Sequence, residues 1–132
     1  MKRSEATNED ELNRICEERT LLARINSNQI VKVHDIHVNK SIYVFLEDMD
    51  AGTLAEVLQN FPCNGLNSEE SLRSVIFQIA SGLRDLHKHD VLHRDLTTEN
   101  IWCSKEGDVK LVDLGTAKFI DRFEKDEYRR CK

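Results

Sequence analysis

The amino-acid sequence predicts an α+β fold, and two kinds of pattern support that prediction. Apolar residues recur at helical spacing over about residues 9–25, and again along a longer stretch that starts at Ser68. Short runs rich in β-branched residues predict strand hairpins over residues 30–47 and 101–112. The 132 residues fit one domain, which can bury about two-thirds of the surface of its unfolded chain.

The first predicted helix carries one charge in an unexpected place. Asn8 and Glu11 form a plausible capping pair at its start. Glu18 lies three residues after Ile15 and four before Leu22, so it falls on the apolar stripe of the helix. An unpaired charge on a buried face is unfavourable, so Glu18 either pairs with a cation or reaches solvent at the edge of the stripe.

The next two runs are predicted to pair as a hairpin. Residues 30–37 and 41–47 are apolar, β-branched and aromatic, and Asn39 and Lys40 lie at the turn between them. A short helix near residues 53–60 should follow, because Pro and Gly residues break the chain again directly after it.

The longest predicted helix begins at Ser68, with Asn67 and Glu70 as a capping pair. Its apolar residues recur at helical spacing and should seek a core. If no further helix covers this stripe, it should expose apolar surface and favour self-association. The stripe consists of Leu72, Val75, Ile76, Ile79, Leu83 and Leu86.

Two short strands, at residues 101–103 and 109–112, are predicted around a turn in which Gly107 supplies backbone freedom. Their pairing should bring Asn100, just before the first strand, close to Asp113, just after the second. Asn100 and Asp113 are therefore expected at neighbouring strand ends.

Composition excludes several functional classes. A net charge of −5 without a basic stripe argues against nucleic-acid binding, and no apolar run is long enough to span a membrane. Residues 121–132 alternate charges with few apolar residues, which predicts a mobile segment. The cysteines are scattered without a CxxC pair, which argues against a zinc site or a disulfide framework and indicates a reducing, cytoplasmic location. They are Cys16, Cys63, Cys103 and Cys131.

The most informative motif is HRDLTTEN at residues 93–100, followed by Asp-Leu-Gly at residues 113–115. Phosphoryl transfer requires a carboxylate near the attacking hydroxyl and oxygen ligands for Mg²⁺. Asp95 offers the first, and Asn100 with Asp113 offers the second. Each string alone could be an ordinary charged turn, but their order around a hairpin favours a functional site.

These motifs resemble the catalytic loop and the metal-binding DFG motif of protein kinases. The resemblance implies that Asp95 and Asn100 are catalytic, that Asn100 and Asp113 bind the metal, and that His93 is a packing residue. ATP and Mg²⁺ are the implied cofactors, and a protein is the implied substrate. The implied fold is a fragment of the kinase domain over residues 1–132.

Within that fragment, residues 1–47 would be a small-lobe remnant with helix αC, and residues 48–132 would hold the hinge, the catalytic loop and the start of the activation segment. The glycine-rich loop and the APE motif of the family do not occur in the sequence. We therefore expect the 132-residue chain by itself not to transfer phosphate. Its oligomeric state stays open.

The resemblance also implies a nucleotide site. Met1 and Lys2 would be the end of a truncated strand, and Lys2 would hold the α- and β-phosphates and pair with Glu18, although Lys2 could equally be a solvated lysine. Leu46 would be the gatekeeper behind adenine, and the backbone of Glu47 to Met49 would be the hinge that binds it. Trp102 occupies a position where the family usually has a leucine under adenine, and its bulk could narrow the pocket.

Two departures from the family leave alternatives open. Thr97 stands where serine/threonine kinases usually carry lysine, and Thr97 with Glu99 fits the tyrosine-kinase pattern no better. We favour a serine/threonine kinase with similarity to the tyrosine-kinase-like group. The alternatives are a pseudokinase-like module that binds ATP without transfer, suggested by Thr97 and Trp102, and a non-catalytic fragment that packs against a partner.

Overall fold

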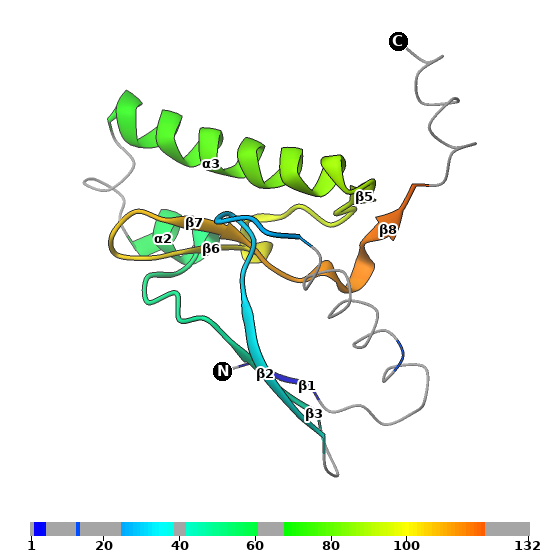
Figure 1. Cartoon of the computed structure of the whole chain (residues 1–132). Helices are drawn as coiled ribbons and strands as arrows, with labels where there is room; N and C mark the ends of the chain where they lie inside the picture. The colour runs from blue at the N-terminus through cyan, green and yellow to red at the C-terminus, as the bar shows by residue number, and fades with distance from the viewer. Residues whose placement is uncertain (1, 5–12, 14–24, 39–41, 61–67, 121–132) are drawn as a thin grey trace.

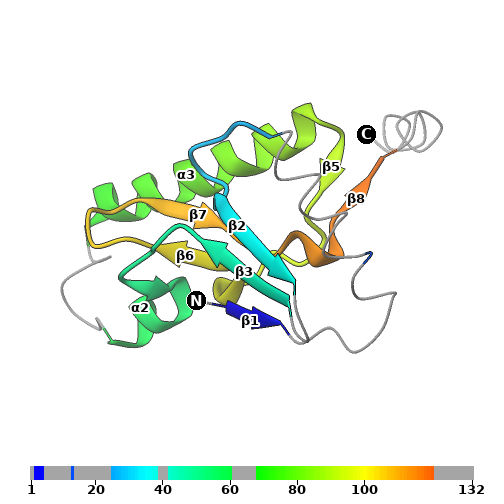
Figure 2. The same cartoon turned by 60° about the horizontal axis from the view of Figure 1, so that its bottom comes forward.

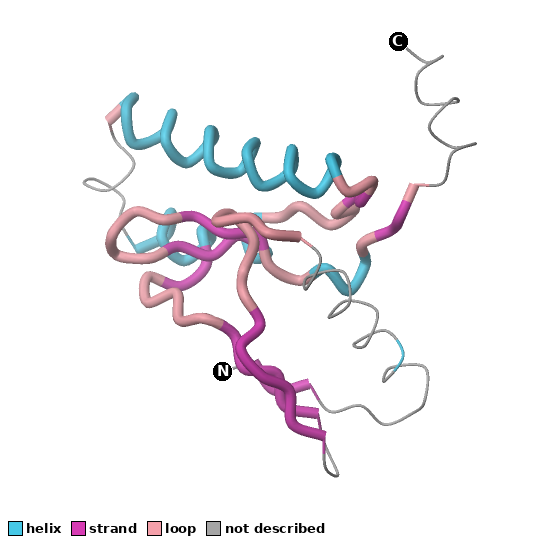
Figure 3. The backbone as a smooth tube through the Cα atoms, in the orientation of Figure 1, coloured by secondary structure: helices cyan, strands magenta, loops and turns pink. Residues whose placement is uncertain are grey.

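The computed structural model describes residues 2–4, 13, 25–38, 42–60 and 68–120 of the chain. A long helix lies along a strand hairpin, and a small antiparallel sheet extends away from that pair (Figure 1, Figure 2). Figure 3 shows the same division by secondary structure, with the longest helix at one end and the small sheet at the other. This arrangement is the α+β fold that the sequence predicts.

The helical part is built around α3, Glu69–Lys88, and the β6–β7 hairpin, Ile101–Cys103 and Val109–Leu111. The helix begins close to where the sequence predicts, but its N-cap is Ser68 rather than Asn67 of the predicted capping pair, because the Ser68 hydroxyl accepts a hydrogen bond from Ser71 N (3.0 Å). Strand β4 extends the hairpin into a sheet of order β4-β6-β7, and β5 pairs with β8. These shorter elements are β4 Gly52–Thr53, α2 Leu54–Asn60, β5 Val91–Leu92 and β8 Lys118–Phe119.

The small sheet has the order β1-β3-β2 with antiparallel neighbours, so the predicted hairpin is confirmed. The first strand of this hairpin, β2, begins at Val33, three residues later than expected. The reason is that Ile30 and Val31 contact β7 instead. Both are buried; Ile30 forms a parallel bridge with Leu111, and Val31 N donates to Leu111 O (3.0 Å). The strands are β1 Lys2–Ser4, β2 Val33–Val38 and β3 Ile42–Leu46.

The buried core lies between α3 and the hairpin. Gly82 allows their close approach, since a Cβ atom there would lie 3.0 Å from Leu111 Cδ1 and 3.1 Å from Gln29 O. Both Leu86 of α3 and Leu111 of β7 are fully buried. The core cluster consists of Ile25, Ile30, Leu54, Leu86, Val91, Ile101, Cys103, Val109, Leu111 and Leu114.

The expectation that the apolar stripe of α3 is exposed is wrong for most of its positions. Strands β5 and β7 pack against this helix and cover the stripe. Leu72 and Ile76 stay exposed, and Phe77, which is not part of the predicted stripe, is 71% exposed. The stripe positions that lie in the core or pack against it are Val75, Ile79, Leu83 and Leu86.

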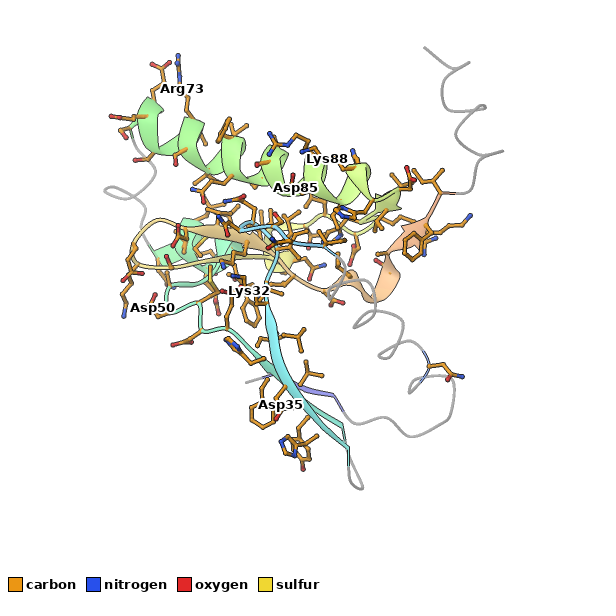
Figure 4. All side chains as sticks on the ribbon, in the orientation of Figure 1. Lys32, Asp35, Asp50, Arg73, Asp85 and Lys88 are labelled. Carbon is orange, nitrogen blue, oxygen red and sulfur yellow. The ribbon has the colours of Figure 1, made fainter. Side chains whose placement is uncertain are left out.

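A charged hydrogen bond ties the segment before β2 to α3. Ser27 is buried and donates its hydroxyl to Asp85 Oδ2 (2.7 Å), while Gln29 N donates to Ser27 Oγ (3.2 Å). Arg84 Nε and Lys88 Nζ lie 3.4 and 3.7 Å from Asp85 Oδ1. Figure 4 labels Asp85 and Lys88 on the last turns of α3. The hydrogen bond from Ser27, helped by these cations, holds the pKa of Asp85 below its usual value.

Several predictions fall wholly or mostly on residues that the structure does not describe. Among them are the helix at about residues 9–25, the carboxylate of Glu18 on it, the turn at Asn39 and Lys40, and the segment 121–132. Among the helices of the described part, none has the length and apolar character needed to cross a membrane.

Candidate active site

The loop of residues 93–100, which follows β5, is fixed by hydrogen bonds of His93, two residues before Asp95. His93 is only 3% exposed, and its Nε2 donates to Val112 O (3.1 Å). Asp95 N donates in turn to His93 Nδ1 (3.4 Å). Arg94 between them has a φ of 66°, a left-handed conformation that a non-glycine residue keeps only where its surroundings hold it. His93 therefore packs, as the resemblance implies, and also orders the loop by hydrogen bonds.

Asn100 connects this loop to the hairpin. Its Nδ2 donates to Asp95 O (3.0 Å) and to Asp95 Oδ2 (2.9 Å). The backbone carbonyl oxygen of Asn100 accepts a hydrogen bond from Val112 N (3.0 Å). Because the amide nitrogen is directed to Asp95, the amide oxygen Oδ1 is the atom of Asn100 that could bind a cation.

Asp113 follows Val112 directly, so it lies at the end of the hairpin beside Asn100, where the sequence predicts it. It has a φ of 62° and a ψ of 71°, and its Oδ1 accepts a hydrogen bond from Gly115 N (3.4 Å). Aspartate is one of the few residues that tolerate this left-handed geometry. The turn at Asp113 changes the direction of the chain two residues after β7 ends.

The side chains of Asp95 and Asn100 are thus hydrogen-bonded to each other, and Asp113 follows Val112, whose backbone N–H donates to Asn100 O. Asp95 is exposed and could accept a proton from an incoming hydroxyl, while Asn100 and Asp113 are half-buried and offer hard oxygen ligands. The donor set fits Mg²⁺, which keeps several waters and needs few protein ligands. Among the described residues, no group of three or more His, Cys, Asp or Glu side chains could hold a metal ion.

The residues expected around adenine lie where β3 meets the hairpin. Leu46 is half-buried at the end of β3, and Met49 is buried with its carbonyl oxygen accepting from Gly52 N (3.2 Å). Trp102 is half-buried on β6, directly opposite Lys110 of β7. The sheet pairing therefore places the indole and the Lys110 side chain on the same face of the hairpin.

The side chain of Glu47 contacts both the segment before β2 and strand β7. Its Oε1 accepts from Lys32 N (2.6 Å), and its Oε2 lies 2.6 Å from Lys110 Nζ. The side chains of Lys110 and Glu47 are only 13% and 18% exposed, so solvent screens this ion pair little. The carboxylate is therefore committed to structure, and so is the backbone N–H of Glu47, which donates to Lys32 O (3.0 Å).

Lys2 begins a strand rather than ending one. The resemblance places it at the end of a strand, but β1 runs from Lys2 to Ser4 and pairs with β3, with Lys2 opposite Val44. Its expected partner Glu18 lies outside the described residues, so their pairing stays a prediction.

Sequence reasoning missed two residues that organise the site. Lys110 stands between two buried strand residues and could have been found by strand alternation, which places it on the face opposite to theirs. Thr116 donates its hydroxyl to His93 O (3.1 Å), a contact across 23 positions that no local pattern signals.

A helix, a loop with the HRDLTTEN string and a hairpin that ends in Asp-Leu-Gly together define a fragment of a kinase-like α+β fold. Comparison of the sequence with known families gives the family itself. The model of the protein kinase domain matches residues 1–131, and the chain belongs to that family.

Curated relatives agree with this assignment. The chain is 36% identical over 105 residues to the probable serine/threonine-protein kinase mkcB of Dictyostelium discoideum, covering 78% of this chain and 14% of the relative. A further probable serine/threonine-protein kinase of that organism is 35% identical over 119 residues, which is 89% of this chain and 23% of the relative. MAP kinase kinase kinase wis4 of Schizosaccharomyces pombe is 29% identical over 110 residues, covering 83% of the chain and 8% of that protein. The chain thus spans less than a quarter of the length of these relatives.

Proposed function

We propose that this chain is part of a serine/threonine protein kinase domain that transfers the γ-phosphate of ATP to a protein hydroxyl. One observation carries the proposal: the side-chain amide of Asn100 donates two hydrogen bonds to Asp95, while the backbone carbonyl oxygen of Asn100 accepts one from Val112 N, next to Asp113. A base and two metal ligands on one rigid unit are what phosphoryl transfer requires of a protein.

In this proposal Asp95 accepts the proton of the attacking hydroxyl, and Asn100 keeps its carboxylate in position. Only one oxygen of Asp95 takes part in the side-chain hydrogen bond with Asn100, and the side chain is exposed to an incoming substrate. Asn100 Oδ1 and the carboxylate of Asp113 would hold Mg²⁺, which neutralises phosphate charge when bound.

The nucleotide would lie between the small sheet and the hairpin. Adenine would be bound by the backbone of Glu47 to Met49, behind which Leu46 stands as the gatekeeper, and Trp102 would form the floor. Support comes from the ion pair that fixes Glu47 and from the half-buried indole of Trp102. Lys2, paired with Glu18, is proposed to hold the α- and β-phosphates.

The division of the domain, the residue specificity and the cellular location are also parts of the proposal. Residues 1–47 are taken as the small-lobe remnant and residues 48–132 as the hinge, catalytic loop and start of the activation segment. Serine/threonine specificity is supported by the names of the relatives, whereas the similarity to the tyrosine-kinase-like group rests on Thr97 alone. An intracellular, reducing location stays a prediction from the cysteine pattern.

A pseudokinase-like module that binds ATP is the second candidate function. It is favoured by Thr97, an exposed residue that brings no charge to a position where the family usually carries lysine. Under this alternative, the full-length natural protein that contains residues 1–132 would bind ATP and Mg²⁺ but release no phosphorylated product.

The deciding experiment is a transfer assay on the purified full-length protein with radiolabelled ATP and a generic protein substrate. We expect Mg²⁺-dependent label on serine or threonine, identified by acid hydrolysis of the product. Label on tyrosine would contradict the proposed specificity. ATP binding without label would select the pseudokinase alternative.

A further inference from the structure

Two segments that flank the site run antiparallel, and their backbone pairing ends before the site is reached. The last paired residues of β5 and β8 are Leu92 and Lys118. If the same register continued for two more residues, Arg94 would lie opposite Thr116. Arg94 has a φ of 66° and cannot extend the strand, so ordinary ladder hydrogen bonds cannot form there.

Side chains take over at this point. Thr116 Oγ1 donates to His93 O (3.1 Å), and Arg94 Nε donates to Thr116 O (2.5 Å). The two hydrogen bonds prolong the contact between the segments after the backbones have ceased to pair. They end one residue before Asp95, the proposed base.

Thr116 is also closely linked to Asp113. The turn of Leu114–Thr116 is closed by Asp113 Oδ1, which accepts from Gly115 N, and by Ala117 N, which donates to Leu114 O (2.9 Å). Because hydrogen bonds close this turn at both ends, a displacement of Thr116 should also displace Asp113.

We propose that Thr116 is a positioning residue, whose hydroxyl couples the segment carrying Asp95 to the turn carrying Asp113. This inference rests on the proposed function and deepens it, since it names what sets the distance between the base and the metal ligand. Geometry has a large effect on such reactions, because a displacement of about 1 Å can cost roughly a hundredfold in rate. Thr116 is exposed and outside the core, so its hydroxyl matters more to turnover than to stability.

The test compares two substitutions of Thr116 in the full-length natural protein. Thr116→Val keeps the branched shape and removes the donor, whereas Thr116→Ser keeps the donor and removes the methyl group. We expect Thr116→Val to lower kcat roughly fivefold to tenfold, the effect of one lost hydrogen bond, with the KM for ATP and the melting temperature nearly unchanged. Thr116→Ser should keep kcat within about twofold of the wild type, as expected if the hydroxyl is the active group.

Equal loss of kcat in both variants would mean that the methyl group acts by packing, and would overturn the inference. Full activity of Thr116→Val would overturn it as well. Amide hydrogen exchange provides a readout that does not need activity. Residues 93–100 and 113–117 should exchange faster together in Thr116→Val and at the wild-type rate in Thr116→Ser.

These outcomes separate the inference from the proposed function. A wild-type protein without transfer activity would overturn the proposed function, and the exchange comparison would then decide the coupling by itself. Unchanged exchange in Thr116→Val would refute the coupling whether or not the protein transfers phosphate.

Discussion

The part of the chain around α3 is stabilised by a buried apolar core, whereas the part around the small sheet is stabilised mainly by strand pairing. The core cluster comes from α2, α3, the hairpin, the segments near them and the residues before β2. In β2 and β3, by contrast, none of the side chains that the structure describes is fully buried, and Phe45 is 40% exposed. Asp95, Asn100 and Asp113 all lie in the first part. The proposed chemistry thus rests on a packed core, whereas the proposed nucleotide contacts rest largely on strand pairing.

Among the described residues, one connection between the two parts is an ion pair. Lys110 of β7 reaches Glu47, which follows β3, and Glu47 in turn accepts a hydrogen bond from the backbone of Lys32 before β2. This connection passes directly beside Trp102, the cross-strand partner of Lys110. The contrast predicts that core substitutions destabilise the fold most, and that substitutions at the connection have intermediate effects.

The largest loss of stability is expected from Gly82→Val. Its Cβ would lie only 3.0 Å from Leu111 Cδ1 and 3.1 Å from the backbone oxygen of Gln29, which cannot move aside easily. Overpacking of this kind costs about 2–3 kcal/mol, which urea unfolding would measure as a lower free energy of unfolding. Ala80→Val on the exposed face of the same helix is the control and should cost only about 0.5 kcal/mol, because valine has a lower helix propensity than alanine. Equal losses in the two variants would show that α3 does not pack tightly on the hairpin.

A smaller loss is expected from Lys110→Met, which leaves the carboxylate of Glu47 without its cation. Removing one partner of a mostly buried pair costs about 2 kcal/mol here, somewhat below the range for fully buried pairs. Lys105→Met is the matched control in the same hairpin, because Lys105 and its partner Asp50 are largely exposed and solvent screens them. Glu47→Gln in the Lys110→Met background should recover part of the stability. If Lys105→Met cost as much as Lys110→Met, the connection would have no special role.

The smallest effect concerns acid stability through Asp85. Its pKa lies below the usual value of 3.8, so its hydrogen bond with Ser27 contributes stability that is fully present above pH 3.8 and is lost as the pH falls through the lower folded pKa. Ser27→Ala should therefore cost about 1 kcal/mol at pH 7 and progressively less in acid. Urea unfolding at pH 7 and at pH values below 3.8 measures this difference. A cost that does not change with pH, or that persists in an Asp85→Asn background, would contradict the assignment.

The elements and the site motif could be predicted from sequence because both are local. Apolar spacing predicted α3, although its N-cap is Ser68 and not Asn67 of the predicted pair. β-branched runs predicted both hairpins, and the hairpin between HRDLTTEN and Asp-Leu-Gly predicted that Asn100 and Asp113 lie at neighbouring strand ends. The exposed stripe was predicted wrongly, because periodicity shows which face of a helix is apolar but not what covers it.

Long-range side-chain pairs were not predictable. Ser27 and Asp85 are 58 positions apart, and Glu47 and Lys110 are 63 apart. Each of these residues belongs to a type that is usually solvated, so composition gives no signal of its pairing. Such contacts depend on the register of packed elements, which a single sequence does not encode locally.

The central claim is that Asp95 acts as the base of a phosphoryl-transfer site built on the α3 and hairpin core. The most direct measurement is the transfer rate and the nucleotide affinity of Asp95→Asn in the full-length natural protein, beside Asp108→Asn on the exposed hairpin turn as a control. We expect Asp95→Asn to lower transfer by a hundredfold or more, on the order expected for loss of a positioned base, and to leave nucleotide affinity nearly unchanged. Asp108→Asn should behave as the wild type. Near-normal transfer by Asp95→Asn would contradict the account.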